Sequence, residues 1–562
     1  MPTLDWIGKK AVLNHHRTVP YRLLRRDPKL SAGEPDSGNL LVEGDNLEAL
    51  KALLPYYAGQ VKCIYIDPPY NTGNKEWTYN DAVDSPEFRS WLGKVVGAES
   101  EDLSRHDKWL CMMYPRLALL QQFLRRDGVV FVSIDGNEVH NLYALMDEVF
   151  GYSNRVGTIV WKNVTDNNPT NISTEHEYIL CYARQKTVLP KEWKASELAV
   201  KTRLLEIGAD FIRRFSVQEE RQREYTKWFS KNKAYLWPFD RYKFIDDGGI
   251  YTGSQSVHNP GKEGYRYDVI HPDTKKPCAE PLMGYRFPLE TIEELLAQKR
   301  ILFGGDETKI VELKVYAKDY RTKLASVIEL DGRLGTIELK EIFPESKRPF
   351  AFPKPTALLE ELLSFVTRPG DLVMDSFAGS ATTGHAVLRL NHGDKGARRF
   401  ILVEMVANIA RDVAAERIRR VAGGYKNARG EQISGIGGGM HYCVLGSSLF
   451  DMGGHISDDV RFEDLAQHVF FTETGQPAPS RARTAASPLI GTLNSIAYYL
   501  LFNGILGDKR LDGGNILTSR VLAALPPHDG PRVIFGEGSR LGAARLKSEG
   551  VTFKQIPYQI KT

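Results

Sequence analysis

Two blocks of alternating strand-like and helix-like segments constrain this chain more than any other feature. Short runs rich in Val, Ile and Leu alternate with amphipathic helical patterns over residues 39–184, and the alternation returns over 346–425. A strand that is apolar along its whole length is typical of a parallel sheet covered by helices on both faces. The two blocks therefore predict an α/β fold built on a parallel sheet.

The clearest strand in the first block is VKCIYI at 61–66, which stops at Asp67-Pro68-Pro69. This pattern predicts a buried parallel strand that ends in a rigid loop. Further elements of the first block are expected at 39–43, 45–57, 109–125, 129–134 and 177–183. In the second block we expect helices at 357–366 and 384–390 and strands at 371–377 and 398–404. Beyond a glycine-rich linker at 434–440, we expect a helical stretch at 491–504 and a strand at 532–536, followed by a final segment, VTFKQIPYQI.

Composition narrows the class of protein. A chain of 562 residues with 42% hydrophobic and 26% charged residues predicts several globular domains rather than disorder. It contains no apolar run of about 18 residues and no N-terminal signal pattern, so we expect a cytoplasmic protein without a membrane span. Its five scattered cysteines predict neither a disulfide framework nor a zinc site, and no metal is expected. The net charge of +4 does not by itself indicate nucleic-acid binding.

The region between the two blocks, 185–345, is weakly periodic and rich in Lys, Arg, Tyr and Trp. Cations that reach phosphates, interleaved with aromatic side chains that stack on bases, suit a DNA-contacting surface. Each of these residues alone fits a solvated face or a small aromatic core equally well, so only the cluster favours DNA. The residues expected to bind DNA are Arg223, Lys227, Trp228, Lys231, Lys233, Arg241 and Lys243, accompanied by Arg221, Tyr225, Tyr235, Trp237 and Tyr242.

The loop Asp67-Pro68-Pro69-Tyr70 carries the first chemical pattern. An exocyclic amine on a base is a poor nucleophile because its lone pair is delocalised into the ring. A carboxylate and a backbone carbonyl that both accept hydrogen bonds from the amine, here Asp67 and Pro68, would draw the nitrogen toward tetrahedral geometry. The two prolines fix the loop, and Tyr70 offers a face on which an extruded base can stack.

A second pattern runs from Asp375 to Gly384, where a strand leads through small residues into a helix. A doubly wound sheet presents nucleotide-like ligands at such a turn, and Gly379 would let the backbone approach the ligand closely. Glu404 ends the next strand, where an acidic side chain can bind ribose hydroxyls. The turn lacks G-x-G-x-x-G, which argues against a dinucleotide.

Together these motifs resemble those of the β-class amino-methyltransferases, in which the catalytic motif precedes the cofactor motif. The resemblance rests on DPPYNTG (67–73), FPKPTALL (352–359) and DSFAGSATTGHAV (375–387). Flanking segments look like the modification subunit of type III restriction–modification systems, and the resemblance covers most of residues 1–450. These segments are 4–24, 40–50, 133–151 and 264–288.

The resemblance implies S-adenosylmethionine as cofactor and roles for individual residues. It implies that the target amine is bound and activated by Asp67, Pro68, Pro69 and Tyr70. It places the cofactor against Asp45, Lys354, Asp375, Phe377, Gly379, Ser380, Thr382 and Glu404. Within that set, Lys354 would lie near the cofactor carboxylate, Glu404 near the ribose and Asp45 near the adenine. Ala381 departs from the pattern, because many relatives have glycine there, and predicts tight backbone packing.

The fold implied is a circularly permuted Rossmann-like methyltransferase domain with an inserted target-recognition domain and a small C-terminal α/β domain. The expected divisions are an N-terminal arm (1–38), a catalytic half (39–184), the insertion (185–345), a cofactor half (346–425) and a C-terminal domain (426–562). Such subunits methylate adenine in double-stranded DNA, commonly as homodimers, and associate with a helicase–nuclease restriction subunit.

Two alternatives remain open at the level of sequence. Amino-cytosine methylation is the nearest, although serine in place of Asp67 is the more usual mark of cytosine among relatives. A catalytically silent DNA-binding specificity subunit is the second. The retained Asp67, Tyr70 and Gly379 argue against it.

Overall fold

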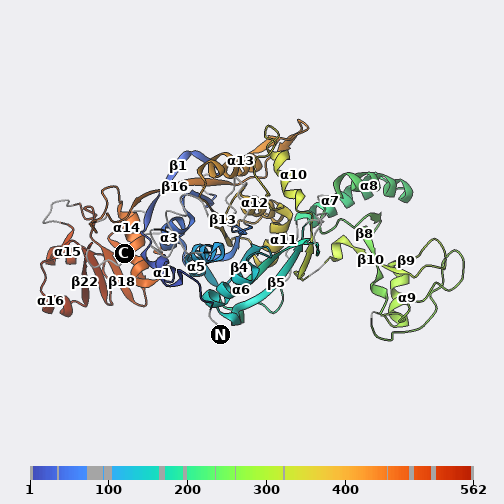
Figure 1. Cartoon of the computed structure of the whole chain (residues 1–562), viewed down its shortest axis with the longest axis horizontal. Helices are drawn as coiled ribbons and strands as arrows, with labels where there is room; N and C mark the ends of the chain where they lie inside the picture. The colour runs from blue at the N-terminus through green and yellow to red at the C-terminus, as the bar shows by residue number, and fades with distance from the viewer. Residues whose placement is uncertain are drawn as a thin grey trace. The chain divides into compact units, whose positions relative to one another are not determined.

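The computed structural model describes the chain in two compact units, residues 193–324 and the remainder. The described residues are 4–34, 37–72, 93, 104–163, 171–193, 199–233, 236–259, 261–320, 323–451, 453–479, 487–507 and 514–557. Tyr235 lies outside these ranges. Figure 1 shows the chain coloured from blue at its N-terminus to red at its C-terminus.

The larger unit is built on a ten-stranded sheet with a parallel centre (Figure 1). In spatial order its strands are β1 (Arg22–Gly33), β16 (Gly439–Ser448), β2 (Leu40–Glu43), β13 (Arg399–Glu404), β12 (Leu372–Asp375), β3 (Val61–Ile66), β4 (Leu124–Ile134), β6 (His176–Ala183), β5 (Arg155–Lys162) and β11 (Val327–Glu329). Its helices are α1 (Lys9–Val12), α2 (His15–Thr18), α3 (Asn46–Tyr57), α5 (Arg105–Phe123), α6 (Val139–Met146), α10 (Arg333–Ile342), α11 (Thr356–Val366), α12 (Thr382–Asp394) and α13 (Glu416–Gly423). The α/β fold class expected from the sequence is confirmed.

The two sequence blocks meet where β3 and β12 pair in parallel, with Val373 opposite Cys63 and Met374 opposite Ile64. From β3 the chain proceeds through α5 to β4 on one side, and from β12 it proceeds through α12 to β13 on the other. Right-handed crossovers in opposite directions place these helices on opposite faces of the sheet. The loops after β3 and β12 therefore diverge at the carboxyl edge and open a crevice between them.

The sheet is mixed, whereas the sequence alternation predicted a parallel one. Strand β6 lies between β4 and β5 and runs antiparallel to both. The segment at 155–162, which forms β5, was not recognised as a strand. It makes an antiparallel pair with its sequence neighbour, as is common at one edge of a largely parallel sheet.

The tail adds a smaller four-stranded sheet covered by α14 (Phe462–Thr474). Its strands are β17 (Leu489–Leu493), β18 (Ile496–Leu500), β20 (Arg532–Gly536) and β22 (Val551–Gln555). Shorter elements are β14 (Gly424–Lys426), β15 (Gln432–Ser434), β19 (Ile516–Leu517), β21 (Gly538–Ser539), α15 (Ser519–Ala524) and α16 (Ala543–Ser548). The helix expected at 491–504 is wrong, since β17 and β18 form an antiparallel hairpin there. Its turn residues Asn494 and Ser495 both have positive φ, which suits a two-residue hairpin loop.

The smaller unit combines two helices with a four-stranded sheet and a short third helix. Its elements are α7 (Ala199–Arg214), α8 (Gln218–Asn232), β7 (Phe244–Asp246), β8 (Gly249–Ser254), α9 (Leu289–Ala297), β9 (Ile301–Leu302) and β10 (Glu312–Tyr316). Aromatic side chains from α7, α8 and the following segment form its core, among them Tyr225 and Tyr242. No helix among the described residues of either unit is long and apolar enough to span a membrane.

Candidate active site

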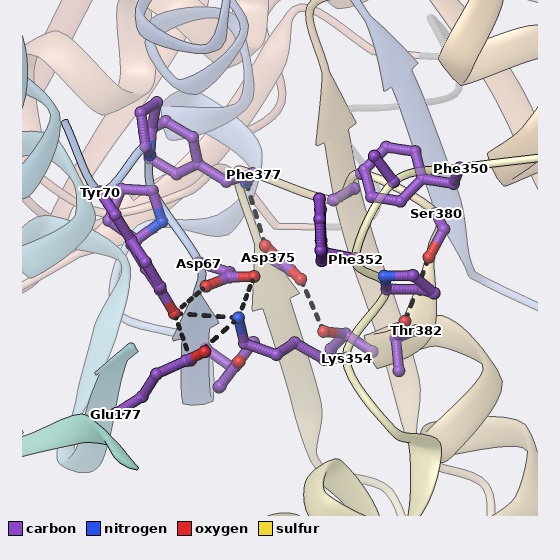
Figure 2. A pocket seen from close by; sticks show the side chains of 18 of the residues that line it. Asp67, Tyr70, Glu177, Phe350, Phe352, Lys354, Asp375, Phe377, Ser380 and Thr382 are labelled. Carbon is purple, nitrogen blue, oxygen red and sulfur yellow. Dashed lines mark hydrogen bonds and ion pairs between the residues drawn. The ribbon is translucent and has the colours of Figure 1, made fainter. Parts of the chain in front are cut away.

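A cavity of about 220 Å³ lies in the crevice at the carboxyl ends of β3 and β12 (Figure 2). Loops from both sequence blocks line it. The expected site residues along its wall are Asp67, Pro68, Pro69, Tyr70, Lys354, Asp375, Phe377, Gly379, Ser380 and Thr382. Two expected cofactor residues, Asp45 and Glu404, are not part of that wall.

The loop after β3 is held in place by buried partners. The indole Nε1 of Trp109 on α5 donates to the Pro69 carbonyl at 2.7 Å. Asn71 has a left-handed backbone with φ 58° and is buried. Its amide donates to the buried Glu138 carboxylate and to the Arg105 carbonyl. These contacts hold the loop at Pro69 and Asn71, on either side of Tyr70.

Four polar side chains meet at the catalytic end of the cavity (Figure 2). The Lys354 ammonium lies 2.9 Å from Asp67 Oδ2 and 3.3 Å from Glu177 Oε2. It also donates to the Tyr70 hydroxyl at 2.9 Å. That hydroxyl lies 2.8 Å from both Asp67 Oδ1 and Glu177 Oε2, so its one proton can go to either carboxylate. The Glu177 Oε1 atom is held by Asn163 Nδ2 at 2.7 Å.

This cluster fixes the charge of Lys354. Burial works to lower the pKa of Lys354, but the carboxylates of Asp67 and Glu177 outweigh it and raise the pKa. Burial, followed by the same two carboxylates, raises the pKa of Tyr70 well above its ordinary value. Lys354 is therefore a cation and Tyr70 a neutral phenol across the physiological pH range.

The turn after β12 is tied to helix α12 by Asp375. Its Oδ1 accepts from the Phe377 amide at 3.0 Å, and its Oδ2 accepts from the Thr383 hydroxyl at 2.6 Å. Burial raises the pKa of Asp375 to about 7, and these two hydrogen bonds oppose the rise. Gly379 follows with φ +50°, in the left-handed region, and its amide donates to Glu404 Oε2 at 2.8 Å. Glu404 thus lies behind the turn and holds it, rather than lining the cavity.

At Ala381 the chain departs from the glycine common among relatives, although the backbone there has a conformation that favours glycine. Ala381 precedes α12 with φ 61° and ψ 35°, a left-handed conformation that glycine adopts without strain. It is completely buried. The fully buried Arg417 braces the same turn, donating to Ser380 Oγ at 3.0 Å and Thr382 Oγ1 at 2.8 Å.

Among the residues of the cavity wall that were not expected from the sequence are Glu177, Phe350 and Phe352. Phe352 is 56% exposed and has φ 55°, an unusual conformation for a residue other than glycine. Its place inside the segment FPKPTALL was the available signal. No local signal marked Glu177, because its position depends on β6 inserting between β4 and β5.

Asp45 serves local structure in this arrangement. It is the N-cap of α3, and its Oδ1 accepts from the amides of Leu47 and Glu48. Its Oδ2 pairs with the buried Arg116 at 3.2 Å. Its expected contact with the cofactor adenine stays a prediction.

In the smaller unit most of the expected basic residues are exposed, whereas several of the aromatic ones are buried. Arg221 is the exception among these cations: its side chain is buried and pairs with Asp247 at 2.7 Å, so it is not part of the exposed basic surface. The side chains of Arg223, Lys227, Lys231, Lys233, Arg241 and Lys243 are exposed. Tyr225 and Tyr242 are buried in the core, so in this arrangement they are not stacking platforms. Trp228 is half-buried and stacks on Tyr225, with ring centroids 5.8 Å apart.

Parallel strands that deliver a DPPY loop and a glycine turn to one cavity define a candidate group-transfer site. The model of the N6/N4 DNA methylase family matches residues 61–416, more than half of the chain. The chain belongs to this family of DNA methylases.

The type III resemblance is confirmed by named relatives. The chain is 50% identical over 414 residues to the Mod subunit of the type III restriction–modification enzyme EcoP15I of Escherichia coli. That match covers 72% of this chain and 64% of the relative. The EcoPI Mod subunit of Escherichia phage P1 is 32% identical over 441 residues, covering 72% of this chain and 63% of the relative. The chain thus aligns with slightly less than two thirds of the length of each.

Among solved structures, the PvuII DNA methyltransferase (cytosine-N4-specific) aligns with a TM-score of 0.33 and 12% identity. The alignment covers 67% of this chain and 86% of that one. A score this low supports no inference about the present chain.

Proposed function

We propose that this protein transfers a methyl group from S-adenosylmethionine to the exocyclic amino group of adenine in duplex DNA. We further propose that it is the modification and specificity subunit of a type III-like restriction–modification system. One observation carries the proposal: the Asp67 loop and the Gly379 turn line a single cavity in a chain of the DNA methylase family. The 50% identity to a Mod subunit supports the type III assignment.

Asp67, Pro68, Pro69 and Tyr70 form the proposed catalytic set. Asp67 accepts a hydrogen bond from the target amine, and the Pro68 carbonyl is the second acceptor. The amine nitrogen bonds to the methyl carbon with its lone pair and becomes positively charged until it releases one proton to water. The Asp67 carboxylate stabilises that charge as it develops, and Tyr70 contacts the face of the base.

The residues of the cavity wall fit the cofactor. Gly379 presents backbone without a side chain, while Phe350, Phe352 and Phe377 surround the cavity with aromatic rings. Aromatic faces and nearby carboxylates suit a ligand that carries a sulfonium charge. S-adenosylmethionine supplies an electrophilic methyl group, and its sulfur keeps the electron pair of the broken carbon–sulfur bond. Cofactor contacts are proposed for Lys354, Asp375, Phe377, Gly379, Ser380 and Thr382, with more distant support from Glu404 and Asp45.

We assign DNA binding to the exposed cations of the smaller unit. This unit lies within the expected insertion at 185–345. Arg223 and Lys227 on α8 are 65% and 63% exposed, and both share Glu224 as an ion-pair partner. Exposed pairs of this kind are weak, so phosphates can replace the carboxylate. We propose phosphate contacts for these residues and for Lys231, Lys233, Arg241 and Lys243, with Trp228 supporting the helix.

The assembly we propose is a homodimer that binds a helicase–nuclease restriction subunit. The two relatives are Mod subunits of type III restriction–modification enzymes. We assign the tail, 426–562, apart from β16 in the main sheet, to dimer or partner contacts, and residues 39–184 and 346–425 to the two halves of a permuted catalytic domain. The cytoplasmic location stays a prediction.

Transfer of tritiated methyl from S-adenosylmethionine to duplex DNA, followed by nucleoside analysis, tests the proposed function. Label on the adenine amino group is the expected result. Label on the cytosine amino group would overturn the choice of base. Intact cofactor and DNA binding with no label on varied duplexes would indicate a silent specificity subunit.

A further inference from the structure

Asp67 is already engaged by two donors in this arrangement. The Tyr70 hydroxyl lies 2.8 Å from Oδ1, and the Lys354 ammonium lies 2.9 Å from Oδ2. The proposed chemistry needs the charge of this carboxylate at the target nitrogen, which becomes positive as the methyl group is transferred. An ammonium held against Asp67 opposes that stabilisation, because it repels the developing charge.

Glu177 offers both donors another acceptor within reach. Its Oε2 lies 2.8 Å from the Tyr70 hydroxyl and 3.3 Å from the Lys354 ammonium. Its Oε1 is fixed by Asn163, whose side chain is itself buried. One end of the Glu177 carboxylate is therefore anchored, while the other end faces the same two donors that hold Asp67.

We propose that Glu177 is a positioning residue that takes over the Tyr70 hydroxyl and the Lys354 ammonium when Asp67 accepts the target amine. This inference rests on the proposed methyl transfer. The Tyr70 hydroxyl has one proton, so donating it to Glu177 releases Asp67 Oδ1. Pairing of Lys354 with Glu177 leaves the charge of Asp67 available to the nitrogen. The cluster then carries one net negative charge, from two carboxylates and one ammonium.

The exchange predicts a specific coupling between Glu177 and Lys354. Replacing Glu177 by the neutral glutamine leaves Lys354 with Asp67 as its only carboxylate within this cluster. Removing the ammonium as well, in the Glu177→Gln/Lys354→Gln double variant, releases Asp67 again. The second substitution should therefore restore part of the kcat lost through the first. If the two residues had independent roles, the fold losses in kcat would multiply instead.

Steady-state methyl transfer to duplex DNA at saturating cofactor tests this coupling, with cofactor affinity measured separately by calorimetry. Glu177→Gln should lower kcat at least about tenfold, within the range seen for loss of one electrostatic contact, with a smaller change in KM for DNA. Its cofactor Kd should stay within about twofold of wild type. The double variant should have a higher kcat than Glu177→Gln.

Glu175→Gln is the matched control, since Glu175 lies two residues away and pairs with Lys162 at 3.4 Å outside the cavity wall. Its kcat should equal that of wild type. A Glu177→Gln kcat within twofold of wild type would overturn the inference, as would multiplied losses in the double variant. Loss of cofactor affinity in Glu177→Gln would mark a structural role and overturn it as well. Absence of methyl transfer by the wild-type protein would instead overturn the proposed function itself.

Discussion

Substituting alanine for Gly379, which adds a single methyl group, tests the role of the proposed cofactor turn. Its φ of +50° lies in the left-handed region, and a Cβ built there would lie 3.0 Å from Phe350 Cζ. An L-residue in this conformation costs about 1–2 kcal/mol. Alanine recovers about 0.4–1 kcal/mol of that by restricting the unfolded chain. Gly379→Ala should therefore destabilise the fold by about 1 kcal/mol and displace the Phe350 ring.

The same variant should weaken cofactor binding, because the displaced ring and the turn both line the cavity. We expect S-adenosylmethionine Kd to rise about tenfold, equivalent to about 1.4 kcal/mol. Gly370→Ala is the matched control. Gly370 also has positive φ, +89°, but nothing lies within 4 Å of its added Cβ, and it is not part of the cavity wall.

Calorimetric titration with cofactor and thermal unfolding of both variants separate the two effects. Both should unfold at similarly lowered temperatures, and only Gly379→Ala should lose cofactor affinity. Wild-type affinity in Gly379→Ala would refute the reasoning, and so would equal loss of affinity in Gly370→Ala.

Two further predictions concern pH and salt. Burial lowers the pKa of His385 to about 3, with Arg417 adding to the effect and Glu338 opposing it, whereas an unfolded histidine titrates near 6.5. The stability that depends on neutral His385 is present above pH 6.5 and is lost as the pH falls toward 3. Between pH 7 and 5 that loss is about 2 kcal/mol. Urea unfolding should show a smaller loss in His385→Gln, and an equal loss would contradict the assignment. Replacing Arg223 and Lys227 by glutamine should weaken DNA binding in anisotropy titrations. The slope of log K against log salt should become shallower by about 2, and an unchanged slope would exclude phosphate contacts there.

The sequence predicted the elements around the site because their signals are local. The apolar run before Asp67 and the small-residue turn after Asp375 appear as a strand with a rigid loop and as a strand–turn–helix. Parallel strands of one sheet end at the same edge, so the meeting of these two loops followed from the fold class.

The features of the fold and site that the sequence did not predict depend on pairing between segments distant in the chain. Glu177 reaches the cavity because β6 lies beside β4, and β16 joins the main sheet although it follows the second block. The hydrophobic periodicity of a strand does not specify which strand lies beside it in the sheet. The helix expected at 491–504 is wrong for a local reason, since Asn494 and Ser495 turn the chain between two antiparallel strands.

The most direct test of the central claim compares wild type with Asp67→Asn. Glu177 remains to pair with Lys354, so the variant keeps a carboxylate beside the ammonium. Single-turnover methyl transfer is measured together with cofactor Kd. We predict transfer at least about a hundredfold slower with Kd within twofold of wild type, because the variant removes the charged acceptor and leaves the cofactor turn intact. Transfer at the wild-type rate by Asp67→Asn would contradict the account.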